Sequence, residues 1–266
     1  MTRQSSFFIA LLLILICSSS SGRTLQQVMN DGTLRVGVAL HTPWAIRSRS
    51  GNLLGFEIDI AKKLAEDMKL DVEFRVYESE RLIPSLESGE IDLIVAKLAI
   101  TPSRALHVNF SQPYIADEIT LATNLTTTVF AKTLEDLNHP DYKIAAVRGH
   151  SAEELVAQIF PRSQHQFYES TDLASAALID EAVDAYLEEE PIPTFLSLEN
   201  PTQVGVPVID PLVKTSVAFA VNKGDADFII FLNAWIIARQ SDTWLKTVRN
   251  YWFESTRWKQ QLDNTD

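Results

Sequence analysis

The chain has 266 residues and a formal net charge of −12, with 35 acidic and 23 basic side chains. Such an acidic surface repels phosphate backbones, and no basic stripe interrupts it, so the composition argues against nucleic-acid binding. Without its N-terminal leader the chain would keep about 240 residues, enough for two modest lobes or one large domain.

Residues 1–22 have the pattern of an export signal. Arg3 precedes the apolar run 7–16, and small residues follow. The run is too short to remain as a membrane anchor. Cys17 is the only cysteine, so the mature chain is expected to have no disulfide and no thiol chemistry. We expect a soluble periplasmic protein; a lipid anchor on Cys17 is the less favoured alternative, because Ile16 suits a lipoprotein processing site poorly.

The first half of the chain alternates strand and helix patterns. Apolar residues recur at helical spacing over 56–68, with charged residues between them. The predicted strands are 33–40, 71–77 and 93–99, and the predicted helices are 56–68 and 82–88. Such alternation requires right-handed crossovers and predicts a parallel sheet that helices cover on both faces.

The second half begins a new alternating series after a short extended segment, 108–114, and a strand, 119–123. Its predicted strands are 143–147, 166–168 and 184–187, and its helices are 133–137, 151–160, 172–180 and one from Pro191. Strand 216–221 is predicted to pair with 119–123, and helices 225–240 and 242–253 to pack back on the first lobe. The chain would then consist of the leader 1–22, a first lobe of 23–121 and 216–266, and a second lobe of 122–215, with a ligand cleft and a hinge between the lobes.

The segment that ends at Arg104 carries the strongest functional signal. Residues 91–96 form an apolar run of strand length, after which Thr101 offers a helix cap and Pro102 the first helical position. Arg104 falls in the first turn, where free N–H groups and the helix dipole are already positive. A cation at this place predicts a bound carboxylate or phosphate. An ion pair with a surface acid is the alternative.

Several motifs occur in the order and spacing of one known family. They are 32–37, 55–61, 82–92, 100–104 and 110–114, followed by 134–137, 147–151 and 183–191. Over residues 30–255 the chain resembles the family 3 bacterial extracellular solute-binding proteins, the polar amino-acid-binding components of ABC importers. The resemblance implies an α/β fold of the two-lobed periplasmic-binding-protein type II, in which each lobe is a mainly parallel sheet flanked by helices and two hinge strands join the lobes.

The resemblance also implies ligand-binding roles for particular residues. In this family the arginine of the Ile-Thr-Pro-x-Arg motif binds the α-carboxylate of the ligand, which assigns that role to Arg104, with helix-end donors near Thr101. Glu189 is the nearest equivalent of the acid that takes the ammonium, and a surface acid is the alternative. Gly149 and Ser151 would close on the carboxylate from the second lobe; a plain N-cap is an equal alternative for Ser151.

The chain departs from the family pattern at several positions of the expected site. Lys97 replaces a small residue and Ala99 replaces Ser or Thr, while Ser79 and His41 fall near positions where aromatic residues often hold the ligand. Trp44 remains as a candidate wall of the cleft. Lys97 would neutralise the ammonium-binding acid, receive a second anionic group of the ligand, or extend along the sheet edge into solvent.

The resemblance implies a monomeric periplasmic protein that captures a small anionic or zwitterionic solute by hinge closure and delivers it to an inner-membrane ABC permease. One alternative is an enzyme similar to cyclohexadienyl dehydratases, with Glu188 or Glu189 as general acid and Lys97 as charge stabiliser. Another is a sensory or accessory protein whose closure is the signal. The histidines are scattered without ligand spacing, and no Gly-rich phosphate loop or nucleophile elbow is present, so neither a metal nor a cofactor is expected.

Overall fold

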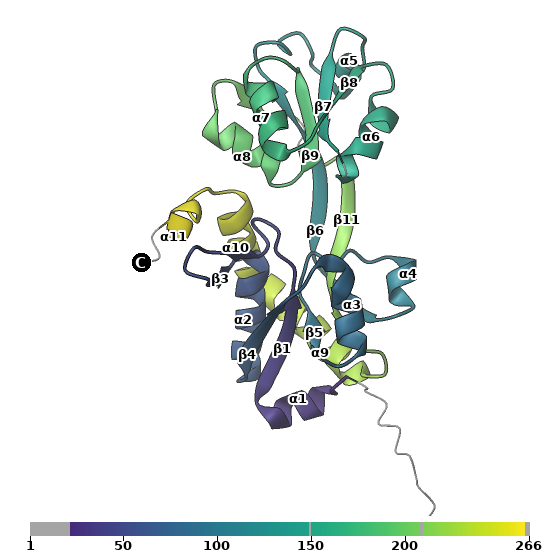
Figure 1. Ribbon diagram of the computed structural model, residues 1–266, viewed down its shortest axis with the longest axis vertical. Helices are drawn as coiled ribbons and strands as arrows, with labels where there is room; N and C mark the ends of the chain where they lie inside the picture. The colour runs from purple at the N-terminus through teal and green to yellow at the C-terminus, as the bar shows by residue number, and fades with distance from the viewer. Residues whose placement is uncertain (1–21, 149, 208–209, 264–266) are drawn as a thin grey trace, which may run out of the picture.

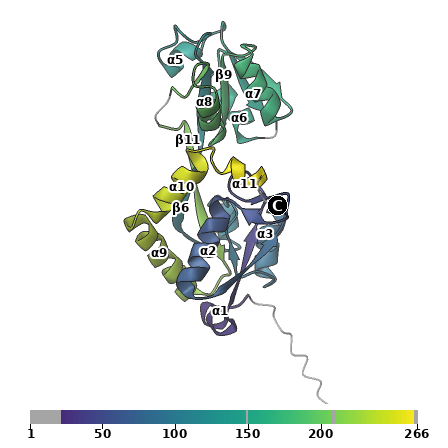
Figure 2. The ribbon, with the colours of Figure 1, turned by 90° about the vertical axis from the view of Figure 1, so that its left-hand side faces the viewer.

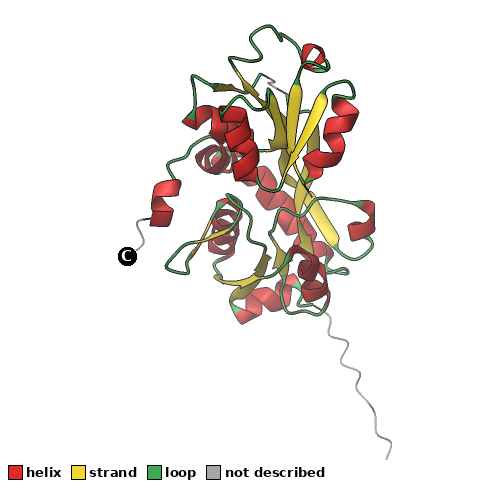
Figure 3. Ribbon diagram, turned by 45° about the horizontal axis from the view of Figure 1, so that its top comes forward, coloured by secondary structure: helices red, strands yellow, loops and turns green. Residues whose placement is uncertain are grey.

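The computed structural model describes residues 22–148, 150–207 and 210–263. Over these ranges the chain forms two lobes joined by two long strands (Figure 1), and helices flank the strands in both lobes (Figure 3). The predicted leader and Cys17 lie outside the described residues. Within the described ranges, no helix combines the length and the apolar character needed to cross a bilayer.

The first lobe contains the predicted parallel strands. β1 (Thr33–Val38) pairs with β4 (Asp71–Val76) along its whole length and with β5 (Leu93–Ile94) on its other side. The accompanying helices are α1 (Leu25–Asp31), α2 (Phe56–Met68) and α3 (Ser79–Glu87), and a small hairpin is formed by β2 (Ile46–Arg47) and β3 (Leu53–Leu54). The helix predicted over 56–68 is confirmed, whereas α1 lies outside the predicted elements.

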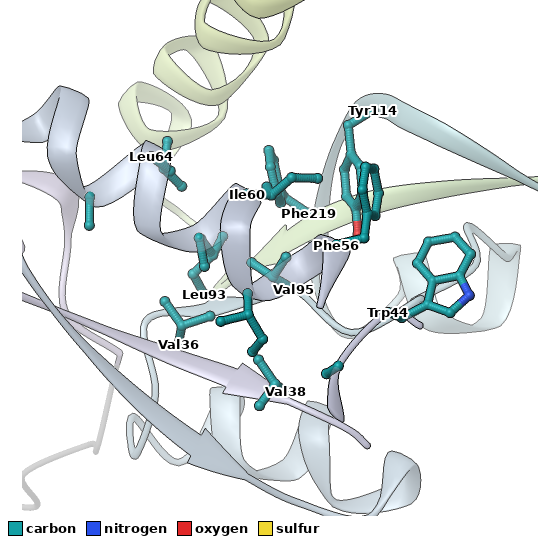
Figure 4. Close-up of a cluster of buried hydrophobic side chains, with 14 of the residues drawn as sticks. Val36, Val38, Trp44, Phe56, Ile60, Leu64, Leu93, Val95, Tyr114 and Phe219 are labelled. Atoms are coloured by element: carbon teal, nitrogen blue, oxygen red, sulfur yellow. The ribbon is translucent and has the colours of Figure 1, made fainter. Parts of the chain in front are cut away.

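A close backbone approach fixes the start of α2. Gly55 has a φ of 132°, and a Cβ added there would lie 2.3 Å from the carbonyl oxygen of Trp44. Only glycine fits this conformation and this space. The helix then places Phe56, Ile60 and Leu64 in the buried core of the lobe, where Figure 4 shows them with Trp44 and the strand residues.

The second lobe repeats the strand–helix alternation. β7 (Lys143–Val147) pairs in parallel with β8 (Gln164–Tyr168) on one side and with β9 (Ala185–Glu189) on the other. The surrounding elements are α5 (Leu134–Leu137), α6 (Ser151–Ile159), α7 (Thr171–Ile179), α8 (Ile192–Glu199) and β10 (Val204–Gly205). The predicted helices and strands of this lobe agree with these elements to within about two residues at each end.

β6 (Asn109–Asn124) and β11 (Val213–Val221) connect the two lobes and make one continuous sheet, whose order is β4-β1-β5-β11-β6-β9-β7-β8. The predicted pairing of 216–221 with 119–123 is wrong in register. Residues 216–221 pair with 109–116, while 119–123 pair with β9. The reason is that 108–114 and 119–123 belong to a single 16-residue strand, whose beginning serves the first lobe and whose end serves the second.

The segment predicted as a strand over 93–99 is also corrected. Regular strand ends at Ile94, and Lys97 adopts a left-handed backbone with a φ of 49°, which no extended strand contains. The helix expected after Thr101 is the single turn α4 (Pro102–Ala105). The dipole argument for an anion at its start is therefore weak, because four residues do not build a macrodipole.

The C-terminal helices return to the first lobe, as predicted. α9 (Ala226–Ser241) and α10 (Trp244–Phe253) pack beside α2 (Figure 2). The Trp252 indole of α10 donates to Asp59 of α2 at 2.8 Å. The short helix α11 (Lys259–Asp263) follows. The Trp258 ring lies 5.7 Å from that of Phe195 on α8, so this segment also contacts the second lobe.

Candidate functional site

Charged side chains from both lobes meet beside the two connecting strands. The Lys97 ammonium, in the turn after β5, lies 2.5 Å from an Oε of Glu189 at the end of β9 and 3.2 Å from an Oδ of Asp117 on β6. The Ser151 hydroxyl, at the start of α6, donates to the other oxygen of Glu189 at 2.9 Å. The cluster therefore joins one cation to two carboxylates across the space between the lobes.

The electrostatic state of the cluster follows from these contacts. Burial alone would lower the pKa of Lys97, but Asp117 and Glu189 outweigh it, and the pKa is raised. Burial alone would raise the pKa of Glu189, but Lys97 and Ser151 lower it. For Asp117, burial and the neighbouring Glu189 charge prevail over Lys97 and raise the pKa to about 6. Lys97 and Glu189 are thus a charged pair at neutral pH.

Glu57 of α2 supports the turn that carries Lys97. Its side chain is fully buried, and one carboxyl oxygen accepts the Lys97 backbone N–H and the Tyr114 hydroxyl, both at 2.5 Å. Among the described residues its other oxygen has no hydrogen-bond partner. Burial raises the pKa of Glu57 to about 7, although both hydrogen bonds act in the opposite direction. Glu57 therefore holds the backbone of Lys97 in place through its hydrogen bond to the Lys97 N–H.

Glu188 supports Glu189 from the second lobe. It is 2% exposed, and its carboxylate accepts the Tyr186 hydroxyl at 2.8 Å and the backbone N–H of Glu189 at 2.9 Å. The His150 ring lies 3.0 Å from the same carboxylate. Burial and the Glu188 charge raise the pKa of Tyr186 far above its usual value, so the tyrosine stays a hydrogen-bond donor. These contacts hold the end of β9 where Glu189 projects.

Two cavities share Glu189 in their walls. The larger has about 500 Å³ and lies against α6 and the connecting strands, with Asp117, Ser151 and Thr215 in its lining. The smaller has about 230 Å³ and is lined by His41, His150, Glu188 and Pro191, among others. Together they provide space for a small molecule on both sides of Glu189.

The structure places Arg104, Thr101 and Ala99 in one hydrogen-bonded turn. The guanidinium of Arg104 donates to the carbonyl oxygen of Ala99 at 2.9 Å, and the Thr101 hydroxyl caps the Arg104 backbone N–H at 3.3 Å. Arg104 is half-buried, and it does not belong to the described lining of either cavity around Glu189. A ligand-binding role for these three residues stays a prediction.

Of the other predicted site residues, Trp44 and His41 lie beside the Lys97 ammonium, whereas no such contact is described for Ser79 and Gly149. Trp44 is fully buried against Phe253, and the Lys97 ammonium lies 5.6 Å from its ring. The His41 ring lies 3.5 Å from that ammonium, and loss of water around the ring together with the Lys97 charge lowers the pKa of His41 to about 4. Ser79 is an exposed first residue of α3, and Gly149 lies outside the described residues.

Asp117 and Glu57 were not predicted as site residues. Asp117 lies between the apolar residues Ile115 and Ile119 of β6, and a charge in such a segment could have marked it as a candidate site residue. Glu57 falls within the motif 55–61, and nothing in its helical pattern indicates that it contacts a turn 40 residues later. Among the described residues, no group of three or more His, Cys, Asp or Glu side chains has the arrangement to hold a metal ion.

The fold is that of a two-lobed binding protein. Residues 34–255 match the family model for bacterial extracellular solute-binding proteins, family 3, and the chain belongs to this family. Both the predicted family and the predicted fold class are confirmed.

Curated relatives and solved structures agree with this assignment. The chain is 25% identical over 246 residues to ABC transporter arginine-binding protein 1 of Escherichia coli K12, and the match covers 91% of this chain and 97% of that protein. It is 29% identical over 210 residues to the ABC transporter glutamine-binding protein GlnH of Bacillus subtilis, covering 77% and 74%. A solved ancestral cationic amino acid solute binding protein superposes with a TM-score of 0.75 at 28% identity, over 86% of this chain and 98% of that one.

Proposed function

We propose that this protein is the solute-binding component of an ABC-type importer, which captures a small carboxylate-bearing solute between its lobes and delivers it to a permease in the inner membrane. The solute is an amino acid or a related organic acid, and the leader 1–22 would export the chain to the periplasm as a monomer. The observation that carries the proposal is the meeting of Lys97 from one lobe with Glu189 and Ser151 from the other, beside the two strands that join the lobes. The family and the names of its relatives support it.

In this proposal Arg104 holds the carboxylate of the ligand. One of its nitrogens is anchored on Ala99, and a guanidinium has further donors in a planar fork that suits two carboxylate oxygens. The Thr101 turn fixes the base of the side chain, and residues 149–151 close on the same group from the second lobe. Hinge motion about β6 and β11 would bring the two halves together.

A dehydratase on the same scaffold is the weaker candidate. Its general acid must keep a proton at neutral pH, which requires a raised pKa. The pKa of Glu189 is lowered by Lys97 and Ser151, so Glu189 is suited to bind a cation and is unsuited to donate a proton. Glu189 is therefore a poor candidate for the general acid, and the family and the names of its relatives favour binding over catalysis.

The test measures stability in the presence of candidate ligands. Chemical denaturation is recorded with amino acids, dicarboxylates, 2-oxo acids and prephenate, and a ligand at 100 times its Kd should add about 2.7 kcal/mol to the free energy of unfolding. Arg104→Ala should abolish this gain without unfolding the protein. Arg81→Ala, on the exposed side of α3, is the control and should keep it. The proposed function is wrong if none of these compounds stabilises the wild type, or if the protein converts prephenate to product. The role of Arg104 alone is wrong if the same ligand stabilises Arg104→Ala as much as it stabilises the wild type.

A further inference from the structure

Lys97 places a cation beside Glu189, the residue to which the resemblance assigns the ammonium of a ligand. Its ammonium bonds to Glu189 at 2.5 Å and to Asp117 at 3.2 Å, and only 16% of the side chain is exposed. The Trp44 ring, 5.6 Å away, gives the ammonium a further favourable contact. The cation of the cluster is thus a permanent part of the chain.

The backbone shows that this placement is held by the fold. A φ of 49° is unfavourable for any residue with a Cβ, and such conformations persist only where the surroundings impose them. Here the surroundings include the buried Glu57, which accepts the Lys97 N–H at 2.5 Å. Lys97 is therefore fixed at its main chain by one carboxyl group and at its ammonium by two others.

Among the described residues, titratable groups from several elements contact the ammonium, its backbone or its neighbours. They are Glu57 on α2, Asp117 on β6, Glu189 on β9, His41 after β1 and His150 before α6. His41 is held in its neutral form at neutral pH. The ammonium thus already pairs with both carboxylates that could otherwise bind a ligand ammonium.

We propose that Lys97 is a built-in counter-cation, and that the cleft consequently selects carboxylates that have no ammonium group, such as 2-oxo acids or dicarboxylic acids. This inference rests on the proposed function, because it concerns the solute of the same site. A ligand ammonium would have to displace Lys97 from Glu189 and leave a mostly buried cation without a partner, which is unfavourable. A carboxylate without an ammonium leaves the pair of Lys97 and Glu189 intact and avoids this cost.

The test uses matched pairs of ligands with the wild type and two variants. Kd values are measured by calorimetry for glutamate and 2-oxoglutarate, for aspartate and succinate, and for phenylalanine and phenylpyruvate. The wild type should bind the deaminated member of at least one pair at least about tenfold more tightly, a difference of about 1.4 kcal/mol. Lys97→Gly relieves the left-handed backbone and frees the two carboxylates, so it should reverse the preference towards the amino acid.

Lys69→Gly is the matched control, because Lys69 is an exposed lysine with a φ of 57° at the end of α2. It removes the same charge and the same backbone strain outside the cleft, and it should keep the wild-type preference. The inference is overturned if the wild type prefers the amino acid in every pair that it binds, or if Lys97→Gly leaves the preference unchanged; the proposed function survives both results. Absence of binding to every compound tested would overturn the proposed function itself, and the inference with it.

Discussion

Glu57→Gln tests how the buried carboxyl beneath Lys97 affects stability. A glutamine has nearly the same shape, and its amide oxygen can still accept the Lys97 N–H and the Tyr114 hydroxyl, which both lie 2.5 Å from the present carboxyl oxygen. The substitution therefore removes the titration of the group while it keeps the two contacts.

The magnitude follows from the pKa of Glu57, which burial raises from 4.5 to about 7. Between these two values the folded protein keeps the proton while the unfolded chain has lost it. The folded state then binds more protons, so the free energy of unfolding falls as the pH rises through this window and levels off above about 7. A shift of this size corresponds to about 3 kcal/mol of lost stability at alkaline pH. The Glu57→Gln variant has no titratable group at this position, so it does not lose this stability as the pH rises.

The assay is urea denaturation of wild type and variant at intervals from pH 4.5 to 8. Between the two ends, the free energy of unfolding of the wild type should fall by about 3 kcal/mol more than that of Glu57→Gln. A new buried N–H group without an acceptor costs the variant about 1–3 kcal/mol, but equally at every pH. Glu80→Gln, exposed in the first turn of α3, controls for the removal of a carboxylate. Parallel pH profiles for wild type and Glu57→Gln would refute the reasoning.

Two further substitutions test contacts in the first lobe, both by urea denaturation. Asp92 is completely buried between the guanidinium groups of Arg23 and Arg35, so Asp92→Asn should lower the free energy of unfolding by about 3–5 kcal/mol at pH 7. Burial alone would raise the pKa of Asp92, but the two arginines lower it. The stability that the Asp92 carboxylate contributes is therefore present above about pH 4 and is lost at lower pH. Equal free energies of unfolding of the wild type and Asp92→Asn at pH 7 would contradict this role of Asp92. Gly55→Ala should cost at least about 1–3 kcal/mol, because its Cβ would collide with backbone, whereas Gly32→Ala, at a φ of 74° with nothing within 4 Å, should cost only about 1 kcal/mol. Equal losses at the two glycines would show that the close approach is unimportant.

The sequence predicts the elements whose periodicity is set by burial. The helix over 56–68 and the strand over 143–147 match the structure residue for residue, because the helix has a regular apolar face against one core and the strand is apolar on both faces, each packed in a core. The pattern is less informative for β6. This strand contains Pro113 and the two adjacent acidic residues Asp117 and Glu118, so its pattern predicts two short pieces although the structure has one continuous strand.

The site was predictable only in part, for a physical reason. Glu189 and Ser151 could be proposed from motif positions, and the structure shows them hydrogen-bonded to each other at 2.9 Å. Pairing of Lys97 with Glu189 was one of the alternatives that the resemblance offered, and the structure has this contact. The contact of Lys97 with Glu57 could not be derived, since Glu57 lies 40 residues before it in another element. Periodicity reports which face of an element is buried, whereas such contacts depend on how separate elements are arranged in space.

Lys97 shows how a departure from a family pattern can be interpreted. The resemblance predicts a small residue at this position, and the backbone here has the left-handed conformation that glycine adopts at no cost. A lysine in this conformation is disfavoured by about 1–2 kcal/mol. A contact with two carboxylates at 2.5 Å and 3.2 Å, in a site that is mostly shielded from water, is of a size to offset that cost. The side chain is therefore best understood through its charge, because a residue kept only to fill space would have relaxed the backbone by being glycine.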